Sequence, residues 1–369
     1  MDISELQRRL APALIPFGVL YAQAMRLRRR AFESGRLHQW RPNCPVVSVG
    51  NIGWGGSGKT PMCGHILRLA TARGERAVVL TRGYGAKPHR LPLFVTPTEN
   101  PTSCGDEPLL LARSHPDARV VVDPVRRRSG PWAYERFDPD FVLLDDGFQH
   151  LPVARDLDLV LLTPHDLGQG WDRVCPAGTW REGASALSRA GAFCVKVGPS
   201  CTLNGETGGD DIAAAIRRRL APLGRPVYTF FLRPGGLKRL DGKARAADLG
   251  GERYVLATGI ADPAQAAATA QALLGSPPAL LIPFADHHAF TAKDVTDILA
   301  KAAGAQVLVT AKDAVKLSRL SEAGAFWALR TKLEWGPAHG APQPFDQWFT
   351  AELDALAERY RPLAASEHL

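Results

Sequence analysis

The sequence predicts an α/β fold in which a mostly parallel sheet is flanked by helices, together with a second, smaller α/β lobe. Short runs rich in Val, Leu and Ile alternate with helix-like segments along the chain. One of these runs leads directly into a glycine-rich loop, where parallel sheets commonly bind ligands. A Gly/Ser/Thr-rich stretch at residues 198–209 separates two sets of expected strands, and we interpret it as a surface loop or hinge.

The glycine-rich loop consists of Gly53, Trp54, Gly55, Gly56, Ser57, Gly58, Lys59 and Thr60. It follows the apolar run 45–49 and precedes a helix-like stretch that extends to residue 73. Glycines let backbone N–H groups point into such a loop, and the next helix adds its positive N-terminus. Lys59 is expected to reach the β- and γ-phosphates, and the Thr60 hydroxyl to bind Mg²⁺. The pattern predicts a nucleoside triphosphate site on a sheet of the P-loop NTPase type.

The other elements follow from apolar periodicity. Strands are expected at residues 46–49, 77–80, 119–122, 141–144, 157–162 and 193–197, and then at 227–232, 254–258, 280–283 and 307–310. Helices are expected at residues 211–220, 263–274, 292–303 and 345–360. We divide the chain into an N-terminal helical segment (1–40), a P-loop domain (41–210), and a second α/β lobe with a C-terminal helix (211–369). An active site is expected in the cleft between the lobes.

Composition narrows the classes of partner. A hydrophobic fraction of 45% excludes wholesale disorder, and a net charge of +8 favours acidic partners. The six cysteines are scattered without a Cys-x-x-Cys pair, which argues against a zinc ribbon and a disulfide scaffold. The arginine clusters at residues 26–30, 126–128 and 217–219 lack an accompanying aromatic platform, so no nucleic-acid partner is expected.

The N-terminal segment has an apolar face followed by positive charge. Residues 10–25 carry no charged side chain, and four arginines follow within residues 26–30. The run is shorter than the roughly 20 apolar residues of a membrane span and contains Pro12 and Pro16. Its basic cluster also lies on the wrong side for a signal peptide. Two interpretations stay open from this segment alone: an amphipathic helix on an anionic membrane surface, or a helix packed on the protein.

Three further groups of polar residues could carry chemistry. Asp145 and Asp146 end the apolar run 141–144, the shape of a Walker B strand, and are expected at the metal site. Gln149 and His150 either lie near the same site or form a turn with a hydrogen-bonded histidine. Asp106 and Glu107 begin a helix-like segment, and their spacing alone favours a helix cap.

His287 lies in an Asp-His-His segment after the run 280–283. It suits a proton relay, a zinc ligand or a buried hydrogen-bonded histidine, but the chain offers no adequate third and fourth zinc ligands. Lys312 and Asp313 partly resemble the guanine-specificity motif of GTPases. That motif separates the two residues by one position, so a GTPase is not predicted.

Together these stretches resemble one family, the tetraacyldisaccharide 4′-kinases of lipid A synthesis. The matching segments follow the family's order and are residues 48–61, 81–85, 105–108, 145–150, 286–290 and 312–316. The resemblance implies a kinase at the cytoplasmic face of the bacterial inner membrane. Its reaction transfers the γ-phosphate of ATP to the 4′-hydroxyl of tetraacyldisaccharide 1-phosphate, giving lipid IVA.

The resemblance also implies residue roles. Asp106 looks like the carboxylate that accepts the hydroxyl proton, His287 like its partner, and Lys59 like a catalytic contact to the phosphates. The cofactors would be ATP and Mg²⁺, with metal ligands among Thr60, Glu107, Asp145 and Asp146. The substrate would be a glycolipid, and the N-terminal helix would contact the anionic membrane surface peripherally.

The chain departs from the family pattern at a few positions, and two other functions remain as alternatives. Ser57 stands where threonine is more common, Ala311 replaces an expected acidic residue, and an unusual Thr179–Trp180 pair interrupts a familiar segment. The nearest alternative is a P-loop kinase for a water-soluble sugar or other small metabolite. The other is a nucleotide switch without an acceptor, against which the additional carboxylates and His287 count.

Overall fold

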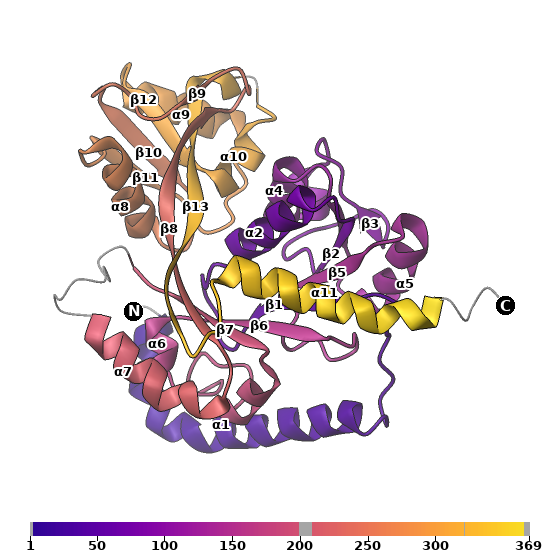
Figure 1. The fold of residues 1–369 in the computed structure, drawn as a ribbon. Helices are drawn as coiled ribbons and strands as arrows, with labels where there is room; N and C mark the ends of the chain where they lie inside the picture. The colour runs from indigo at the N-terminus through magenta and orange to yellow at the C-terminus, as the bar shows by residue number, and fades with distance from the viewer. Residues whose placement is uncertain (1–2, 199–208, 321, 365–369) are drawn as a thin grey trace.

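The computed structural model describes residues 3–198, 209–320 and 322–364, and Figure 1 shows their arrangement. The helices are α1 (Ile3–Glu33), α2 (Lys59–Ala72), α3 (Pro101–Cys104), α4 (Asp106–Ser114), α5 (Arg126–Phe137), α6 (Pro164–Leu167), α7 (Gly209–Arg219), α8 (Pro263–Leu274), α9 (Ala292–Ala302), α10 (Ala311–Leu317) and α11 (Phe345–Ala364). The strands are β1 (Val46–Asn51), β2 (Ala77–Thr81), β3 (Leu93–Phe94), β4 (Arg119–Val122), β5 (Phe141–Asp145), β6 (Leu157–Leu162), β7 (Ala192–Lys196), β8 (Val227–Arg239), β9 (Arg245–Ala246), β10 (Tyr254–Thr258), β11 (Leu280–Pro283), β12 (Gln306–Thr310) and β13 (Phe326–His339).

Within the described residues the strands form one sheet in the order β11-β10-β12-β13-β8-β7-β6-β1-β5-β2-β4-β3, with β9 paired to β8. β1 lies inside the P-loop part and pairs in parallel with β5 and β6. All six of its residues are buried, as expected for a strand covered on both faces. The mostly parallel α/β sheet predicted from the sequence is confirmed.

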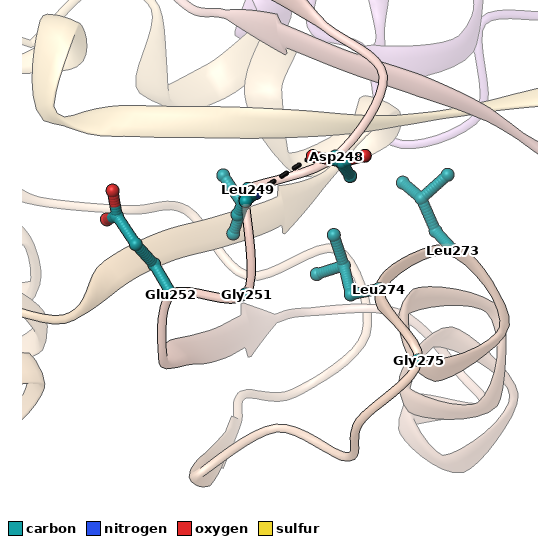
Figure 2. Close-up of a pocket in the computed structure, with 8 residues that line it drawn as sticks. Asp248, Leu249, Gly251, Glu252, Leu273, Leu274 and Gly275 are labelled. Carbon is teal, nitrogen blue, oxygen red and sulfur yellow. Dashed lines mark hydrogen bonds between the residues drawn. The ribbon is translucent and has the colours of Figure 1, made fainter.

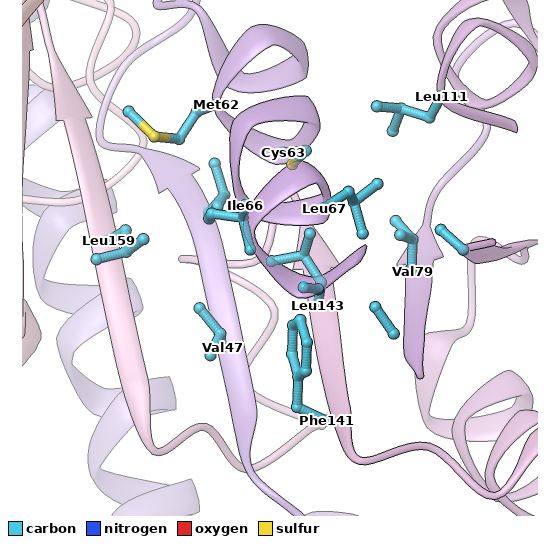
Figure 3. Packing of buried hydrophobic residues seen from close by; sticks show 14 of the residues in the cluster. Val47, Met62, Cys63, Ile66, Leu67, Val79, Leu111, Phe141, Leu143 and Leu159 are labelled. Atoms are coloured by element: carbon cyan, nitrogen blue, oxygen red, sulfur yellow. The ribbon is translucent and has the colours of Figure 1, made fainter. Parts of the chain in front are cut away.

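A buried apolar core between α2 and the sheet holds α2 in position against β1 and β5. Figure 3 shows Ile66 and Leu67 of α2 above Val47 of β1 and Leu143 of β5, and all four are buried. Helix α2 thus presents one apolar face to the sheet, as an amphipathic helix does. The start of α2 is thereby fixed at the carboxyl end of β1, where the loop must bind phosphate.

The second lobe is joined to the first by a long antiparallel ribbon that the sequence predicted only in part. β8 and β13 pair from Val227↔His339 to Arg239↔Trp327. The expected strand ended at residue 232, just before Pro234, Gly235 and Gly236, which locally favour a turn. The ribbon continues through them with a register shift opposite residues 329–331, since a bulge relieves the pairing that proline cannot make.

Two helices assigned to the second lobe pack beside the P-loop part. The side chains of α11 that face inward join the core around α2 and are Phe345, Trp348, Phe349, Leu353 and Leu356. Figure 1 shows α11 lying across this part of the molecule. Ile216 and Leu220, in and directly after α7, join the core on the opposite face of the sheet. The division at residue 210 stays a prediction, and most of the hinge expected at 198–209 lies outside the described residues.

Helix α1 is longer than the uncharged run that predicted it. Its stretch Leu10–Glu33 has 24 residues and contains an 18-residue window with a mean hydropathy of 1.3. Judged by length and composition, it alone among the described helices is long and apolar enough to cross a membrane. Pro12 and Pro16 lie within the helix. Length therefore does not argue against a span. Large apolar side chains on α1, including Phe17 and Leu20, are exposed.

Candidate active site

The phosphate-binding loop connects β1 to α2, and its shape depends on two glycines. Gly55 and Gly58 have φ angles of 118° and 89°, in the left-handed region that favours glycine. A Cβ atom on Gly58 would also lie 3.1 Å from the ring of Phe230. The positive φ angle and the close approach of the Phe230 ring therefore both favour glycine at position 58. Phosphate-binding loops use glycine in this way.

The unusual Thr179–Trp180 pair supports the first residues of this loop. Trp180 forms an antiparallel bridge with Gly53, and the Trp54 N–H donates to the Thr179 carbonyl at 3.0 Å. The Trp180 indole is buried and donates to Asp166 Oδ1 at 2.9 Å. The departure from the family pattern thus lies in a segment that braces the loop.

Lys59 and Thr60, at the start of α2, contact carboxylates from two other elements. Lys59 Nζ donates to Asn51 Oδ1 at 3.1 Å and lies 3.6 Å from Asp146 Oδ1. The Thr60 hydroxyl donates to Glu107 Oε2 at 3.1 Å. The structure therefore brings four of the predicted site residues together: Lys59, Thr60, Glu107 and Asp146.

Asp145, the last residue of β5, is the more buried of the two neighbouring aspartates. It is buried, and its Oδ2 accepts a hydrogen bond from the Thr81 hydroxyl at 2.8 Å. Burial, together with the nearby Glu107 carboxylate, raises the pKa of Asp145 to about 6. Negative charge is therefore crowded at this end of the sheet.

Asp146, in contrast to Asp145, lies mainly among positive charges. Arg181 donates to its Oδ2 at 2.9 Å, and Lys59 approaches its Oδ1. Burial alone would raise the pKa of Asp146, but these two cations outweigh it and hold the pKa below its ordinary value. Its φ angle of 50° is an uncommon conformation, of the kind that clusters at functional sites.

Arg126 and Arg181 belong to this part of the site, although the sequence did not single them out. Arg126 donates to the backbone carbonyls of Asp145 and Asp146 at 2.7 and 2.9 Å. Burial lowers the pKa of Arg126 to about 10. For Arg126 the signal in the sequence was the Arg cluster at residues 126–128, which could not be told from a solvated helix face. Arg181 lies in the familiar segment that the Thr179–Trp180 pair interrupts, but no role was assigned to it.

A divalent cation fits these residues. Asp145, Asp146 and Glu107 supply oxygens, the donor type that Mg²⁺ prefers, and Asp146 Oδ1 is buried without a hydrogen-bond partner among the described residues. In the same described ranges, no three His, Cys, Asp or Glu side chains form a ready metal cage. Mg²⁺ at phosphoryl-transfer sites commonly takes only one or two protein carboxylates, with phosphate and water as its other ligands.

The acceptor side of the site is formed between the lobes. His287 Nδ1, from the second lobe, lies 3.2 Å from Asp106 Oδ2 at the start of α4. Lys312 Nζ lies 3.2 Å from His287 Nε2. Since an ammonium only donates, we assign Nε2 as acceptor and place the ring proton on Nδ1, where it bonds to Asp106. The sequence alone had favoured a helix cap for Asp106, whereas its carboxylate is directed to a histidine.

His287 itself has a constrained backbone and an aromatic neighbour. Its φ angle is 60°, which non-glycine residues adopt uncommonly and histidine more readily than most. The ring of Tyr84, an exposed side chain, has its centroid 5.7 Å from that of the His287 ring. This places the predicted segment 81–85 beside the acceptor side.

The segment 145–150 contributes a second histidine that faces a different environment. Gln149 Nε2 donates to the Asn51 carbonyl at 2.9 Å, behind the phosphate-binding loop. His150 Nε2 is buried and has no hydrogen-bond partner among the residues that the structure describes. Burial, together with the adjacent Arg126, lowers the pKa of His150 to about 3. The sequence interpretation of a hydrogen-bonded histidine in a turn is therefore wrong for this side chain.

A pocket of about 400 Å³ lies elsewhere, on the second lobe. Figure 2 shows Asp248, Leu249 and Glu252 on one side of it and Leu273 and Leu274 on the other. None of the predicted site residues lines it. We assign the candidate active site to the residues around the P-loop, where charged side chains and the candidate catalytic side chains converge.

Fold and site together define a P-loop phosphotransferase with an acceptor side built from a second lobe. A family described as LpxK, tetraacyldisaccharide-1-P 4′-kinase, matches residues 10–353. A tetraacyldisaccharide 4′-kinase of Nitratidesulfovibrio vulgaris is 46% identical over 357 residues, covering 97% of this chain and 98% of the relative. One of Oleidesulfovibrio alaskensis is 48% identical over 366 residues, covering 97% and 99%.

Among solved structures, a crystal structure of LpxK from Aquifex aeolicus in complex with ATP is similar, with a TM-score of 0.73. It is 27% identical, and the match covers 94% of this chain and 99% of that one. The chain belongs to the tetraacyldisaccharide-1-P 4′-kinase family. The sequence prediction of a tetraacyldisaccharide 4′-kinase in lipid A biosynthesis is thereby confirmed.

Proposed function

We propose that this chain binds ATP at residues 53–60 and transfers its γ-phosphate to the 4′-hydroxyl of tetraacyldisaccharide 1-phosphate, with Asp106 as the proton acceptor. The observation that carries the residue assignment is the contact between His287 Nδ1 and Asp106 Oδ2 across the two lobes. Asp106 is followed directly by Glu107, which hydrogen-bonds Thr60 of the phosphate-binding loop. The proposed base is therefore adjacent in sequence to a residue in contact with the nucleotide site.

In the proposed reaction the 4′-oxygen bonds to the γ-phosphorus while the bond to the β,γ-bridging oxygen breaks and ADP leaves. The hydroxyl proton passes to Asp106. A sugar hydroxyl is a weak acid, so along a loose transition state the carboxylate receives the proton late. His287, with its proton on Nδ1, orients Asp106 and stabilises its charge. Lys59 compensates the charge that develops on the phosphate oxygens.

Mg²⁺ would be held by Thr60 and by carboxylates among Glu107, Asp145 and Asp146. Bound there, it would neutralise phosphate charge, the general role of the metal in phosphoryl transfer. The raised pKa of Asp145 supports this assignment, and so does the buried Oδ1 of Asp146, which accepts no hydrogen bond from the described residues, because a cation would relieve both. Arg126 and Arg181 hold the backbone and side chain of the same aspartates in place.

Association with the cytoplasmic face of the inner membrane is proposed for α1. Support comes from its exposed apolar side chains and from the arginines that follow them. Removing residues 1–25 should abolish co-flotation with vesicles containing an anionic phospholipid while ATP binding persists. A truncated, folded protein that still floats with vesicles would contradict the assignment to α1.

The reaction is tested by transfer of ³²P from γ-labelled ATP to tetraacyldisaccharide 1-phosphate in detergent micelles with Mg²⁺. Labelled lipid is expected, and Asp106→Ala should remove it while ATP binding remains. Folded, ATP-binding wild-type protein that labels a soluble sugar and not the lipid would contradict the proposed acceptor. Undiminished labelling by Asp106→Ala would contradict the proposed base.

A further inference from the structure

Lys316, on α10 of the second lobe, lies between two carboxylates from different lobes. Its Nζ is 3.5 Å from Asp106 Oδ2 and 3.4 Å from Asp313 Oδ1. The Lys316 side chain is only 8% exposed, and Asp313 is fully buried. Nζ also lies 5.4 Å from the centroid of the Phe290 ring, which shields it from water. A buried ammonium in this setting is retained only where its charge is compensated.

The second carboxylate of this group is fixed independently of Lys316. Asp313 Oδ2 accepts hydrogen bonds from the hydroxyls of Thr258 and Thr310 at 2.9 and 2.7 Å. It also accepts from the Gly259 N–H at 3.2 Å. Because the ends of β10 and β12 hold Asp313, its Oδ1 is a rigid anchor for Lys316. The anchor belongs to the second lobe, and the group that Lys316 reaches belongs to the first.

Helix α10 is docked on α4 at both of its ends. Arg113 of α4 donates to the Ser318 hydroxyl at 2.7 Å and to the Val315 carbonyl at 3.2 Å, at the far end of α10. At the near end, Lys312 and Lys316 are four residues apart and so share one helix face. Lys312 lies near His287 and Glu107, and Lys316 near Asp106. The face of α10 that carries both lysines is thus directed to the acceptor side of the site.

The contacts of the Asp106 carboxylate fall on one of its oxygens. Both His287 Nδ1 and Lys316 Nζ approach Oδ2. No hydrogen bond to Oδ1 is made by the residues that the structure describes. Two cross-lobe contacts on Oδ2 fix the plane of the carboxylate and leave Oδ1 for the hydroxyl of an acceptor.

We propose that Lys316, anchored by Asp313, is a positioning residue that orients the Asp106 carboxylate toward the acceptor hydroxyl. This inference rests on the proposed role of Asp106 as proton acceptor. Lys316 touches neither nucleotide nor acceptor in this role, and it takes no proton. Its ammonium keeps Oδ2 occupied, so that Oδ1 receives the hydroxyl proton as the oxygen–phosphorus bond forms. His287 alone cannot fix the carboxylate plane, since a single contact leaves it free to rotate.

The test compares kcat and KM of Lys316→Met, Lys316→Arg and the wild type in the lipid kinase assay. Lys316→Met should lower kcat about ten- to hundredfold, the scale for loss of a residue that orients a catalytic group. KM for ATP and the Kd of ATP should change by less than about threefold, because the phosphate-binding loop and its contacts are unchanged. Lys316→Arg keeps the cation and should recover most of kcat.

A double-mutant cycle separates positioning from a general loss of packing. In an Asp106→Asn background, Lys316→Met should cause little further loss, since two residues that act as a unit are not additive. Ser318→Ala is the matched control, because it removes an α4–α10 hydrogen bond at the other end of the same helix. It should keep kcat within about twofold of the wild type. Thermal melting verifies that each variant is folded.

The outcomes distinguish this inference from the proposed function. If Asp106→Asn abolishes transfer and folded Lys316→Met keeps wild-type kcat, Lys316 has no positioning role and the base assignment stands. The same conclusion follows if Lys316→Met and Asp106→Asn multiply in their effects. If Lys316→Met fails to fold, Lys316→Arg and Asp313→Asn are compared instead. A kcat kept by Lys316→Arg and lowered by Asp313→Asn, with Ser318→Ala near the wild type, supports the inference, whereas wild-type kcat in Asp313→Asn contradicts it. Failure of wild-type protein to label the lipid overturns the proposed function itself.

Discussion

The two sides of the active site are built differently. The proposed phosphate side consists of residues 53–60, which follow β1, and of Asp145 and Asp146 at the end of the neighbouring strand β5. The acceptor side brings Asp106 of the first lobe to within hydrogen-bond distance of His287, 181 residues away in the second. The phosphate side depends on local backbone shape and a packed core. The acceptor side depends on how the two lobes meet along the β8–β13 ribbon and the α4–α10 contact.

Because the two sides are built differently, substitutions on them should affect ATP binding and phosphate transfer separately. A change on the phosphate side should remove nucleotide binding together with turnover. A change on the acceptor side should leave nucleotide binding intact and remove turnover alone, because the proposed role of these residues is confined to the transfer of the hydroxyl proton. The following variants test this separation, beginning with the largest expected effect.

Lys59→Ala should lower kcat about 10³- to 10⁵-fold, the scale for removing a cation from the transferring phosphoryl group. It should also weaken ATP binding, because the ammonium that faces the phosphates is lost and the Asp146 charge is left less compensated. Measurement of kcat and of the Kd of ATP checks both parts. Unchanged ATP affinity and turnover would remove Lys59 from the phosphate side.

Asp106→Asn should lower kcat about 10²- to 10⁴-fold, the range for loss of a general base, while the Kd of ATP stays near its wild-type value. His287→Ala should have the same direction and a smaller effect, since it removes a partner of the base and not the base. Single-turnover transfer alongside ATP titration distinguishes the two. Loss of ATP affinity in either variant would show that the two sides are not separable.

Arg181→Met should lower activity about ten- to hundredfold, because it removes a partner that holds a carboxylate of the proposed metal site. The loss should shrink as the Mg²⁺ concentration is raised, if the displaced Asp146 mainly weakens metal binding. Arg41→Met provides a matched control, since Arg41 pairs with Asp156 at the surface away from the loop. Equal losses in both variants would argue against a specific role for Arg181.

His150→Gln should change stability rather than chemistry. The pKa of His150 is about 3 in the folded protein, below the ordinary 6.5, so the unfolded chain binds the proton first. Stability is therefore full above pH 6.5 and is lost as the pH falls toward 3. At pH 5 the loss is about 2 kcal/mol. His150→Gln should remove this part of the pH dependence of the unfolding free energy, measured with denaturant. The control His165→Gln changes an exposed histidine and should leave this pH dependence in place.

The sequence by itself determined the features that are local along the chain. Three features could be predicted because each depends on residues that are neighbours in the sequence. They are the apolar run that leads into residues 53–60, the pair Asp145 and Asp146 at the end of β5, and the alternation of strands and helices. The bounds of β4, β6, β10, β11 and α8 were predicted to the residue. The order of the matching motifs was enough to identify the family and its activity.

Only the tertiary structure decided which distant residues meet. From sequence spacing alone, Asp106 was interpreted as a helix cap, and Lys316 could not be distinguished from a surface lysine. The contact between these two side chains depends on the packing of α10 against α4. The β8–β13 ribbon passes through Pro234 and two glycines that locally favour a turn, since the ten residue pairs between the two strands outweigh that preference. Helix α11 was predicted by its apolar period, but its position beside α2 depends on a core shared with the P-loop part.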